Sequence, residues 1–376
     1  MSALVLISER DVPCLTPVRF PAPAGTPGDV SLVLVGEKGV CLPAQRDGSD
    51  VVALVGPLAG GTERRFELIA AAPAGAAVAV WELEDRRLEM RLRGEVCAAY
   101  HYSSHHARPF LHPVLGPGGL PVTRSYPLAQ VAGETNDHPH HRSLWTAYGA
   151  VNGVDDWSEA AGQHGFIRHR RFLEVQSGAV FGGFTAELLW TAPDGEPVLS
   201  ERRTIRLYNT EPERRLLDYE VTFIASHGDV HFGDTKEGGI VAVRVATSMD
   251  AKRGGRIENE VGGVGEAQCW GKRAAWCDYS GPVPSRQVGM GIAVMDHPRN
   301  FRHPTHWHVR DYGLMAANVF GAATFERDSG RRGEHVLKNG EELMFRYRLL
   351  VHRGNATDGR VSDAYHAYAQ PPKVRT

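Results

Sequence analysis

The sequence lacks long apolar runs and an excess of charge of either sign. The longest apolar stretches, such as residues 68–79, are broken by Pro and Gly and fall short of the roughly 18 to 20 residues that a membrane-spanning helix needs. Forty-two Lys and Arg stand against 44 Asp and Glu, a formal net charge of -2. We therefore expect neither a membrane nor a nucleic acid as partner.

Cysteine is also scarce. The five cysteines are widely spaced and contain no C-x-x-C pair, which argues against a structural zinc site or a redox couple. The amino terminus has no basic leader and no small-residue cleavage site, so we expect a cytoplasmic protein with reduced thiols. The pattern leaves the oligomeric state open.

The motifs of several large enzyme classes are missing. The sequence has no G-x-x-x-x-G-K-[ST], no strand-linked G-x-G-x-x-G, no G-x-S-x-G and no H-E-x-x-H. These absences remove the support for an NTPase, a dehydrogenase, a serine hydrolase or a zincin. Internal repeats and long amphipathic helices are not evident either, which disfavours a solenoid or propeller.

The sequence contains 42 Gly and 23 Pro, which separate short runs rich in Val, Leu, Phe and Tyr. This pattern is typical of strands connected by turns. It predicts a mainly β fold, a large antiparallel β-sandwich over residues 81–376 after a small N-terminal β region at 1–80. A hairpin is expected at 192–195, and one short C-terminal helix at 362–368, packed on a sheet edge. The expected strands are 30–35, 78–81, 88–92, 184–190, 200–207, 216–224, 240–245, 291–295 and 343–351.

All 18 histidines follow residue 100, so chemistry is expected in the larger second part. The densest group, at 137–142, places His138, His140, His141 and Arg142 around Pro139, which prevents a regular helix. Histidines beside a carboxylate suit proton transfer or metal binding. The alternative is that these are structural histidines in a loop at the end of a sheet.

Two later segments carry further candidates. Residues 231–239 contain Asp234, Lys236 and Glu237, which suit acid, base and electrostatic roles; a solvated turn is the favoured alternative on sequence alone. If residues 306–310 are extended, His306, His308 and Arg310 share one face of the strand.

Tryptophans lie close to these clusters. Their flat faces beside polar groups suit sugar rings, although each one separately is equally well explained as filling a wide sandwich core. The tryptophans in question are Trp145, Trp157, Trp270, Trp276 and Trp307.

Taken together, segments 137–142, 232–239, 270–273, 276–281 and 307–313 resemble the bacterial PmoA-like family of unknown function. The resemblance covers roughly residues 100–355. Its name comes from a membrane-bound methane monooxygenase subunit, a reading that a chain without a spanning segment does not support. Segment 339–349 and the strand order look similar to supersandwich folds of the galactose mutarotase type. That similarity implies a carbohydrate site on a concave sheet face.

The leading hypothesis is a carbohydrate-active enzyme of epimerase, mutarotase or lyase type that uses acid–base chemistry. In it His140 or His141 is the base, Glu237 or His308 is the acid, and the substrate contacts are Arg142, Trp145, Trp157, Asp234, Lys236 and Arg310. No cofactor is predicted, but a divalent metal is possible. The alternatives are a non-catalytic carbohydrate-binding protein and a His-ligated metalloenzyme.

Overall fold

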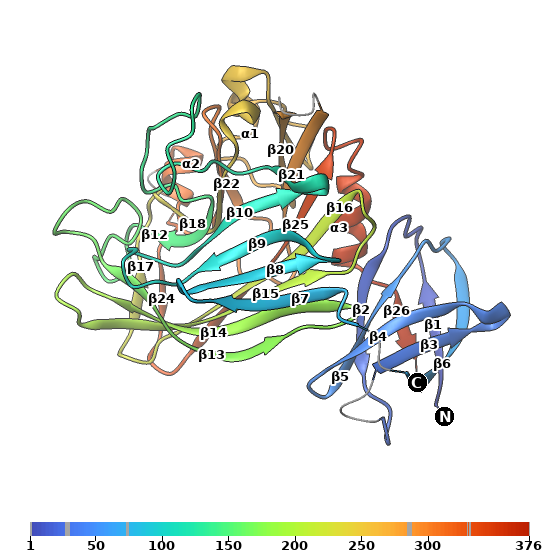
Figure 1. Ribbon diagram of the computed structural model, residues 1–376. Coiled ribbons are helices and arrows are strands. Elements are labelled where there is room, and N and C mark those ends of the chain that lie inside the picture. The colour runs from blue at the N-terminus through green and yellow to red at the C-terminus, as the bar shows by residue number, and fades with distance from the viewer. Residues whose placement is uncertain are drawn as a thin grey trace.

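The computed structural model describes residues 2–26, 31–72, 75–283, 288–328, 330 and 332–375. Within these ranges the strands form three large sheets and a separate two-stranded sheet, and the pairings between named strands are antiparallel (Figure 1). The predicted mainly β class is confirmed. Some glycines and prolines form turns between strands, as at 192–195, whereas others, such as Pro43, Pro113 and Gly183, lie within strands.

The N-terminal sheet forms the blue body at the lower right of Figure 1, where both chain ends lie. It has its own hydrophobic core around Leu34, Val51 and Phe66. Gln45 links it to the rest of the molecule, because its side-chain oxygen accepts hydrogen bonds from the backbone amides of Val180 and Phe181. In spatial order its strands are β2 (Thr16–Pro21), β5 (Asp50–Val55), β4 (Cys41–Asp47), β3 (Ser31–Gly36), β6 (Thr62–Ala71), β1 (Ser2–Ser8) and β26 (Lys373–Arg375).

The other two large sheets face each other. The nine-stranded sheet runs in the order β22 (His306–Val309), β23 (Leu314–Asn318), β18 (Gly238–Arg244), β12 (Leu144–Tyr148), β10 (Phe110–Gly116), β9 (Glu95–His101), β8 (Arg87–Leu92) and β7 (Val78–Leu83), with β11 (Leu120–Pro121) paired to β10. The eight-stranded sheet runs β13 (Phe166–Gln176), β14 (Phe181–Thr191), β15 (Pro197–Tyr208), β16 (Arg214–Ile224), β25 (Glu342–Arg353), β21 (Val288–Asp296), β20 (Trp276–Val283) and β19 (Arg256–Asn259).

One large apolar core fills the space between these two sheets. Leu144, Val243 and Trp307 from the nine-stranded sheet pack in the same cluster as Tyr219 and Leu349 from the eight-stranded sheet. Side chains alternate across a strand, so the neighbours of the first three point the opposite way. The expected sandwich is therefore present, and the nine-stranded sheet has an outer face that is turned away from this core.

The predicted strands all fall on observed ones, and the hairpin at 192–195 joins β14 to β15. The expected strand at 30–35 corresponds to β3, although Val30 lies outside the described residues. Two short strands, β17 (Val230–Phe232) and β24 (His335–Leu337), pair with each other. They escaped prediction because three residues are too few for a periodic pattern.

The described helices are short: α1 (Glu266–Cys269), α2 (Ala322–Glu326) and α3 (Val361–Ala369). The predicted C-terminal helix corresponds to α3, which contacts β2, an edge strand of the N-terminal sheet, as expected, and also packs on the eight-stranded sheet. Val361, Tyr365 and Tyr368 follow a helical spacing and pack with Leu216 of β16 and Leu350 of β25, two central strands of the eight-stranded sheet. A helix with this apolar stripe buries more surface on the face of a sheet than at its edge.

None of the described helices has the length and apolar character that crossing a bilayer requires. All five cysteines are free thiols, and Cys97, Cys269 and Cys277 are buried.

Candidate functional site

A row of residues crosses the outer face of the nine-stranded sheet and forms the floor of the candidate site. Trp145 of β12 pairs with Ala242 of β18, which pairs with Ala316 of β23, which pairs with His308 of β22. Three strand spacings of about 4.8 Å separate the first and last strands by about 14 Å. Large side chains thus stand at both ends of a row whose middle consists of two alanines.

Glycine extends this small-residue floor. A Cβ added at Gly239 would lie 2.8 Å from the Ala316 Cβ and 3.1 Å from the Ala242 Cβ, closer than such carbons approach. Because the residues in the middle of the row have small side chains, large rings can lie directly over the sheet. Trp145, Ala242 and Ala316 pack with Tyr312 in a cluster separate from the sandwich core.

Aromatic rings from two segments stack above this floor. The His141 ring lies between Trp145, at 5.3 Å, and His138, at 4.8 Å between centroids. The ring of Tyr312 stacks on His138 at 4.9 Å and lies 6.4 Å from the ring of His141. Trp157 packs against Trp145 at 5.3 Å. The first and third histidine-containing segments of the sequence therefore meet here.

The loop that carries the first cluster, residues 137–142, is fixed by two buried arginines. The Asp137 carboxylate accepts hydrogen bonds from Arg124 and, at 2.6 Å, from Arg244 of β18. Both guanidinium groups are buried, and they lower the pKa of Asp137 to about 2 against the raising effect of its partial burial. His138 has a φ of 45°, a left-handed conformation that the sequence around Pro139 gave no means of predicting.

His141 is buried, and its Nδ1 lies 3.1 Å from a terminal nitrogen of Arg244. Its pKa lies well below the ordinary value, first because of burial and then because of His140 and Arg244. The neighbouring His140 is half-buried, and burial together with Arg108 lowers its pKa to about 4. Both imidazoles are therefore neutral at pH 7.

Asn318 of β23 holds the second cluster, residues 231–239, beside the third cluster, residues 306–310. The Asn318 amide nitrogen donates to the carbonyl oxygens of Thr235, Lys236 and Gly238 at 3.0 to 3.3 Å. Lys236 and Glu237 form an ion pair with each other, and both side chains are exposed. They occupy the solvent-facing rim of the site.

Asp234 has a different environment from its two neighbours. One carboxylate oxygen accepts hydrogen bonds from the backbone amides of Ala323, at 3.0 Å, and Gly333, at 2.6 Å. These bonds attach the start of α2 and the segment before β24 to the second cluster. The geometry favours this structural role over the sugar contact expected from the sequence.

His308 lies at the far end of the floor. It is 2% exposed, and neither ring nitrogen makes a hydrogen bond of good geometry. Burial lowers its pKa to about 4 despite the opposing charge of Glu237. His306, two residues earlier on the same face, instead binds Glu326 at 3.1 Å. The sequence prediction that these two histidines share a face is confirmed by their common neighbour Phe325.

The charge of Glu237 affects the pKa of residues in the first and third clusters. Its charge acts on the pKa of His140 in the first cluster, of His308 in the third and of Tyr312 between them. Arg310 lies with its guanidinium carbon 5.3 Å from the centre of the Tyr312 ring and pairs with Glu266 at 2.9 Å. Ring contacts join His140, His141, Trp145 and Trp157 at one end of the floor, and Glu237 lies within electrostatic range of His140 and of His308 at the other end.

Arg142 is less available than a substrate clamp has to be. Its guanidinium binds both carboxylate oxygens of Glu159, at 2.7 and 3.1 Å. Arg108, which is buried, binds the same carboxylate at 2.8 Å. This bidentate arrangement fixes the loop that carries Trp157, so the geometry favours an indirect role for Arg142.

Sequence reasoning missed three groups of this site. Arg244 is the one charged residue in an otherwise apolar expected strand. A charged residue in a buried strand indicates a buried partner, so the sequence contained a signal for this residue. Tyr312 lay inside a quoted motif but received no role. Glu159 belongs to no motif and gave no signal.

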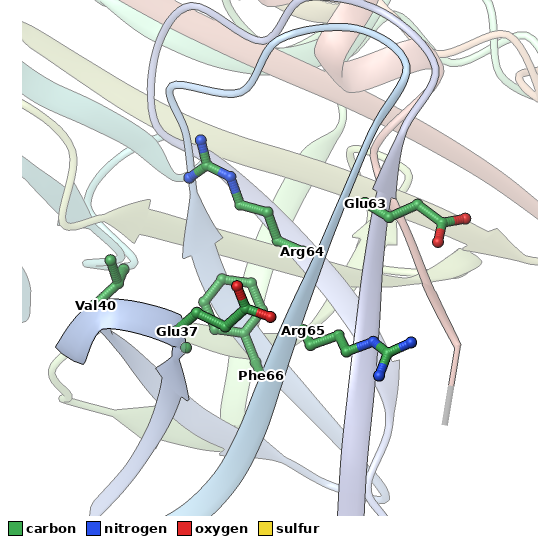
Figure 2. Close-up of a pocket in the computed structure, with 7 residues that line it drawn as sticks. Glu37, Val40, Glu63, Arg64, Arg65 and Phe66 are labelled. Atoms are coloured by element: carbon green, nitrogen blue, oxygen red, sulfur yellow. The ribbon is translucent and has the colours of Figure 1, made fainter.

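Among the described residues, no group of three His, Cys, Asp or Glu side chains is arranged to hold a metal ion. The hollow in Figure 2 lies on the N-terminal sheet and contains no histidine. Its lining consists of Gly36, Glu37, Val40, Glu63, Arg64, Arg65 and Phe66. It shares no residue with the outer-face site.

No curated protein matches the sequence significantly. Among solved structures, a glycosyl hydrolase family 38 protein from Enterococcus faecalis is 11% identical, with a TM-score of 0.41 over 99% of this chain. An α-galactosidase from Lactobacillus brevis is 8% identical, with a TM-score of 0.36 over 79% of this chain. The matches span 47% and 42% of those proteins, so the chain matches less than half the length of either.

A family model matches residues 87–366, the region that holds the sandwich strands from β8 onward and the whole outer-face site. The expected membership of a family without assigned function is confirmed, whereas the PmoA-like name finds no support in this match. The chain belongs to the family of unknown function DUF6807.

Proposed function

We propose that the chain is a carbohydrate-active enzyme, of isomerase or lyase type, that carries out acid–base chemistry at the outer-face site. One observation carries this proposal. Three chain segments far apart in sequence place His140, Glu237 and His308 over the outer face of one sheet, His308 on strand β22 and the other two on the segments that precede β12 and β18, and Glu237 acts on the pKa of both histidines. Groups that exchange protons with one substrate have to meet in this way.

The protonation states refine the expected roles. A pKa of about 4 leaves His140 and His308 neutral at pH 7, and a neutral imidazole accepts a proton more readily than it donates one. We therefore assign both as candidate bases, although the sequence favoured His308 as an acid. Glu237 takes the second proton-transfer role at the rim of the site.

A sugar suits the remaining groups. The indole nitrogens of Trp145 and Trp157 are buried without hydrogen-bond partners, and an unmet buried donor is costly unless a ligand or water accepts from it. Sugar hydroxyls are such acceptors. Lys236 and Arg310 at the rim supply charged donors, while Arg142 and Asp234 hold the surrounding loops.

The test is turnover of a panel of free sugars, glycosides and keto-glycosides, followed by NMR. We expect one of them to be converted by the wild-type protein, and conversion to fall by about 10²- to 10⁴-fold in His308→Leu and in His140→Ala. His366→Ala, an exposed histidine on α3, is the matched control and should retain full activity.

Binding of a sugar without conversion of any would contradict the enzyme and identify a carbohydrate-binding protein. Conversion that survives both substitutions would place the chemistry elsewhere in the chain.

A further inference from the structure

A hydrogen-bonded series runs from Asp137 through Arg244 to His141. One terminal nitrogen of Arg244 donates to Asp137 at 2.6 Å, and the other lies 3.1 Å from Nδ1 of His141. An arginine guanidinium has donors only and does not lose its proton in proteins. Nδ1 of His141 must therefore accept, which fixes the single proton of the imidazole on Nε2.

The surroundings of His141 oppose a second proton. His138 and His140 contact its ring, and Arg124 and Arg244 add two positive charges, whereas Asp137 is the only carboxylate bonded to those arginines in the parts of these loops that the structure describes. Stacking between Trp145 and His138 holds the plane of the ring. Among the described residues, the hydrogen-bond partner of the ring is Arg244, at Nδ1.

We propose that Nε2–H of His141 donates a hydrogen bond to a carbonyl oxygen of the substrate, that Arg244 is the positioning residue that fixes this tautomer, and that the substrate is a sugar bearing a ketone or aldehyde. This inference rests on the proposed function and specifies its substrate class.

The chemistry that fits is proton abstraction beside the carbonyl. His140, whose neutral ring lies 4.4 Å from that of His141 between centroids, removes the proton from the carbon next to the carbonyl, and the electron pair of the broken C–H bond forms the C=C bond of an enolate. The carbonyl oxygen takes up the negative charge and accepts the hydrogen bond from His141. Return of the proton from the charged histidine to the same carbon gives the epimer or the original sugar. Alternatively the carbonyl re-forms, a C=C bond forms to the next carbon as the bond from that carbon to its oxygen substituent breaks, and the substituent leaves with the proton that the histidine took up.

A neutral donor is suited to this step. Preorganised donors aimed at an oxygen that becomes negative stabilise the transition state, and a neutral imidazole does so at pH 7 without first having to be protonated. Cleavage of an ordinary glycoside instead needs a proton donor for the leaving oxygen, which neutral His140, His141 and His308 do not supply.

The tautomer is tested on the unmodified protein. In protein labelled with ¹⁵N-histidine, long-range ¹H–¹⁵N correlation should show His141 protonated on Nε2 only, unchanged from pH 8 to pH 5.5, with His141→Gln used to assign the signal. Arg244→Lys, which keeps a donor, should preserve the pattern, and Arg244→Met should release it. Protonation on Nδ1, or titration in this range, would overturn the inference.

The substrate class is tested by exchange in D₂O. We expect keto-sugars or keto-glycosides to take up deuterium beside the carbonyl, and the matched reduced sugars to show no change. His141→Ala should slow exchange by about 10²- to 10³-fold, with partial rescue in His141→Gln, whose amide also donates. Conversion of ordinary glycosides without exchange would leave the proposed function standing and defeat this inference.

Discussion

Two buried histidines in different regions of the sandwich have pKa values that are shifted in opposite directions. His352, on β25 of the eight-stranded sheet, is 1% exposed and lies 2.8 Å from the carboxylate of Asp278. Burial alone would lower its pKa, but Asp278 raises it above the ordinary value. His308, on the outer-face site, is 2% exposed, and its pKa is about 4.

Burial is nearly the same at the two positions, so it does not explain the difference. A counter-ion does, since an adjacent carboxylate favours the charged form and desolvation alone disfavours it. The chain pairs a buried histidine where it serves the fold and leaves one without a bonded carboxylate in the site. At pH 7 the histidine in the site is therefore in the neutral form, which is the form that can accept a proton.

Replacing His308 with leucine is the change with the largest expected effect. We predict that His308→Leu loses about 10²- to 10⁴-fold in turnover of the substrate found in the sugar panel. Its free energy of unfolding should stay within about 1 kcal/mol of the wild-type value, because the removed ring makes no hydrogen bond of good geometry. Urea unfolding checks the second part; a large loss of stability would remove the contrast with His352.

Asp278→Ala should act in the opposite way, on stability rather than on turnover. Removing one partner of a buried pair costs about 3 to 5 kcal/mol. Because the pKa of His352 is raised in the fold, the pair's contribution is complete below the unfolded pKa of about 6.5 and declines as pH rises through the folded value. Urea unfolding from pH 5.5 to 9 should show the variant closest to wild type at high pH.

Acid stability gives a third comparison. The pKa of His308 is about 6.5 in the unfolded chain and about 4 in the folded protein. Between these two pH values the unfolded state binds more protons, so the stability of the fold decreases as the pH is lowered. The shift corresponds to about 3 kcal/mol at pH 4. His308→Leu should reduce the loss of stability between pH 7 and pH 4 by up to that amount, whereas an identical acid limb would contradict the low pKa.

The smallest effect is expected from an exposed ion pair. Glu9, which follows β1, pairs with Lys373 of β26 at 2.6 Å, but both side chains are about 70% exposed. We predict that Glu9→Gln leaves the urea midpoint of unfolding unchanged within the error of the measurement. A loss comparable to that of Asp278→Ala would show that burial is not what makes the His352 pair important.

The strands of the sandwich could be predicted from the sequence because a strand's pattern of side chains depends on residues that are close in sequence. Alternation and turn residues located β14, β15 and the turn between them, and the face shared by His306 and His308 follows directly from the two-residue period of a strand. These features depend on neighbours in sequence, which a single chain displays.

Partners across the sheets could not be read in the same way. Nothing near Arg142 in sequence indicates that Glu159 occupies it, and nothing near Asp234 indicates its bonds to Ala323 and Gly333. The expected pH dependence also changes, because burial moves the histidine pKa values away from 6.5. Such effects arise from contacts between segments up to about a hundred residues apart.

The most direct test follows His308 and His352 in one pH titration of ¹⁵N-histidine-labelled protein, with His308→Leu and His352→Gln assigning the two signals. We predict that His352 is still largely protonated at pH 6.5, whereas His308 stays neutral down to pH 5. Titration of His308 near pH 6.5 would contradict the account, because the site would then hold an ordinary histidine rather than one kept neutral by burial.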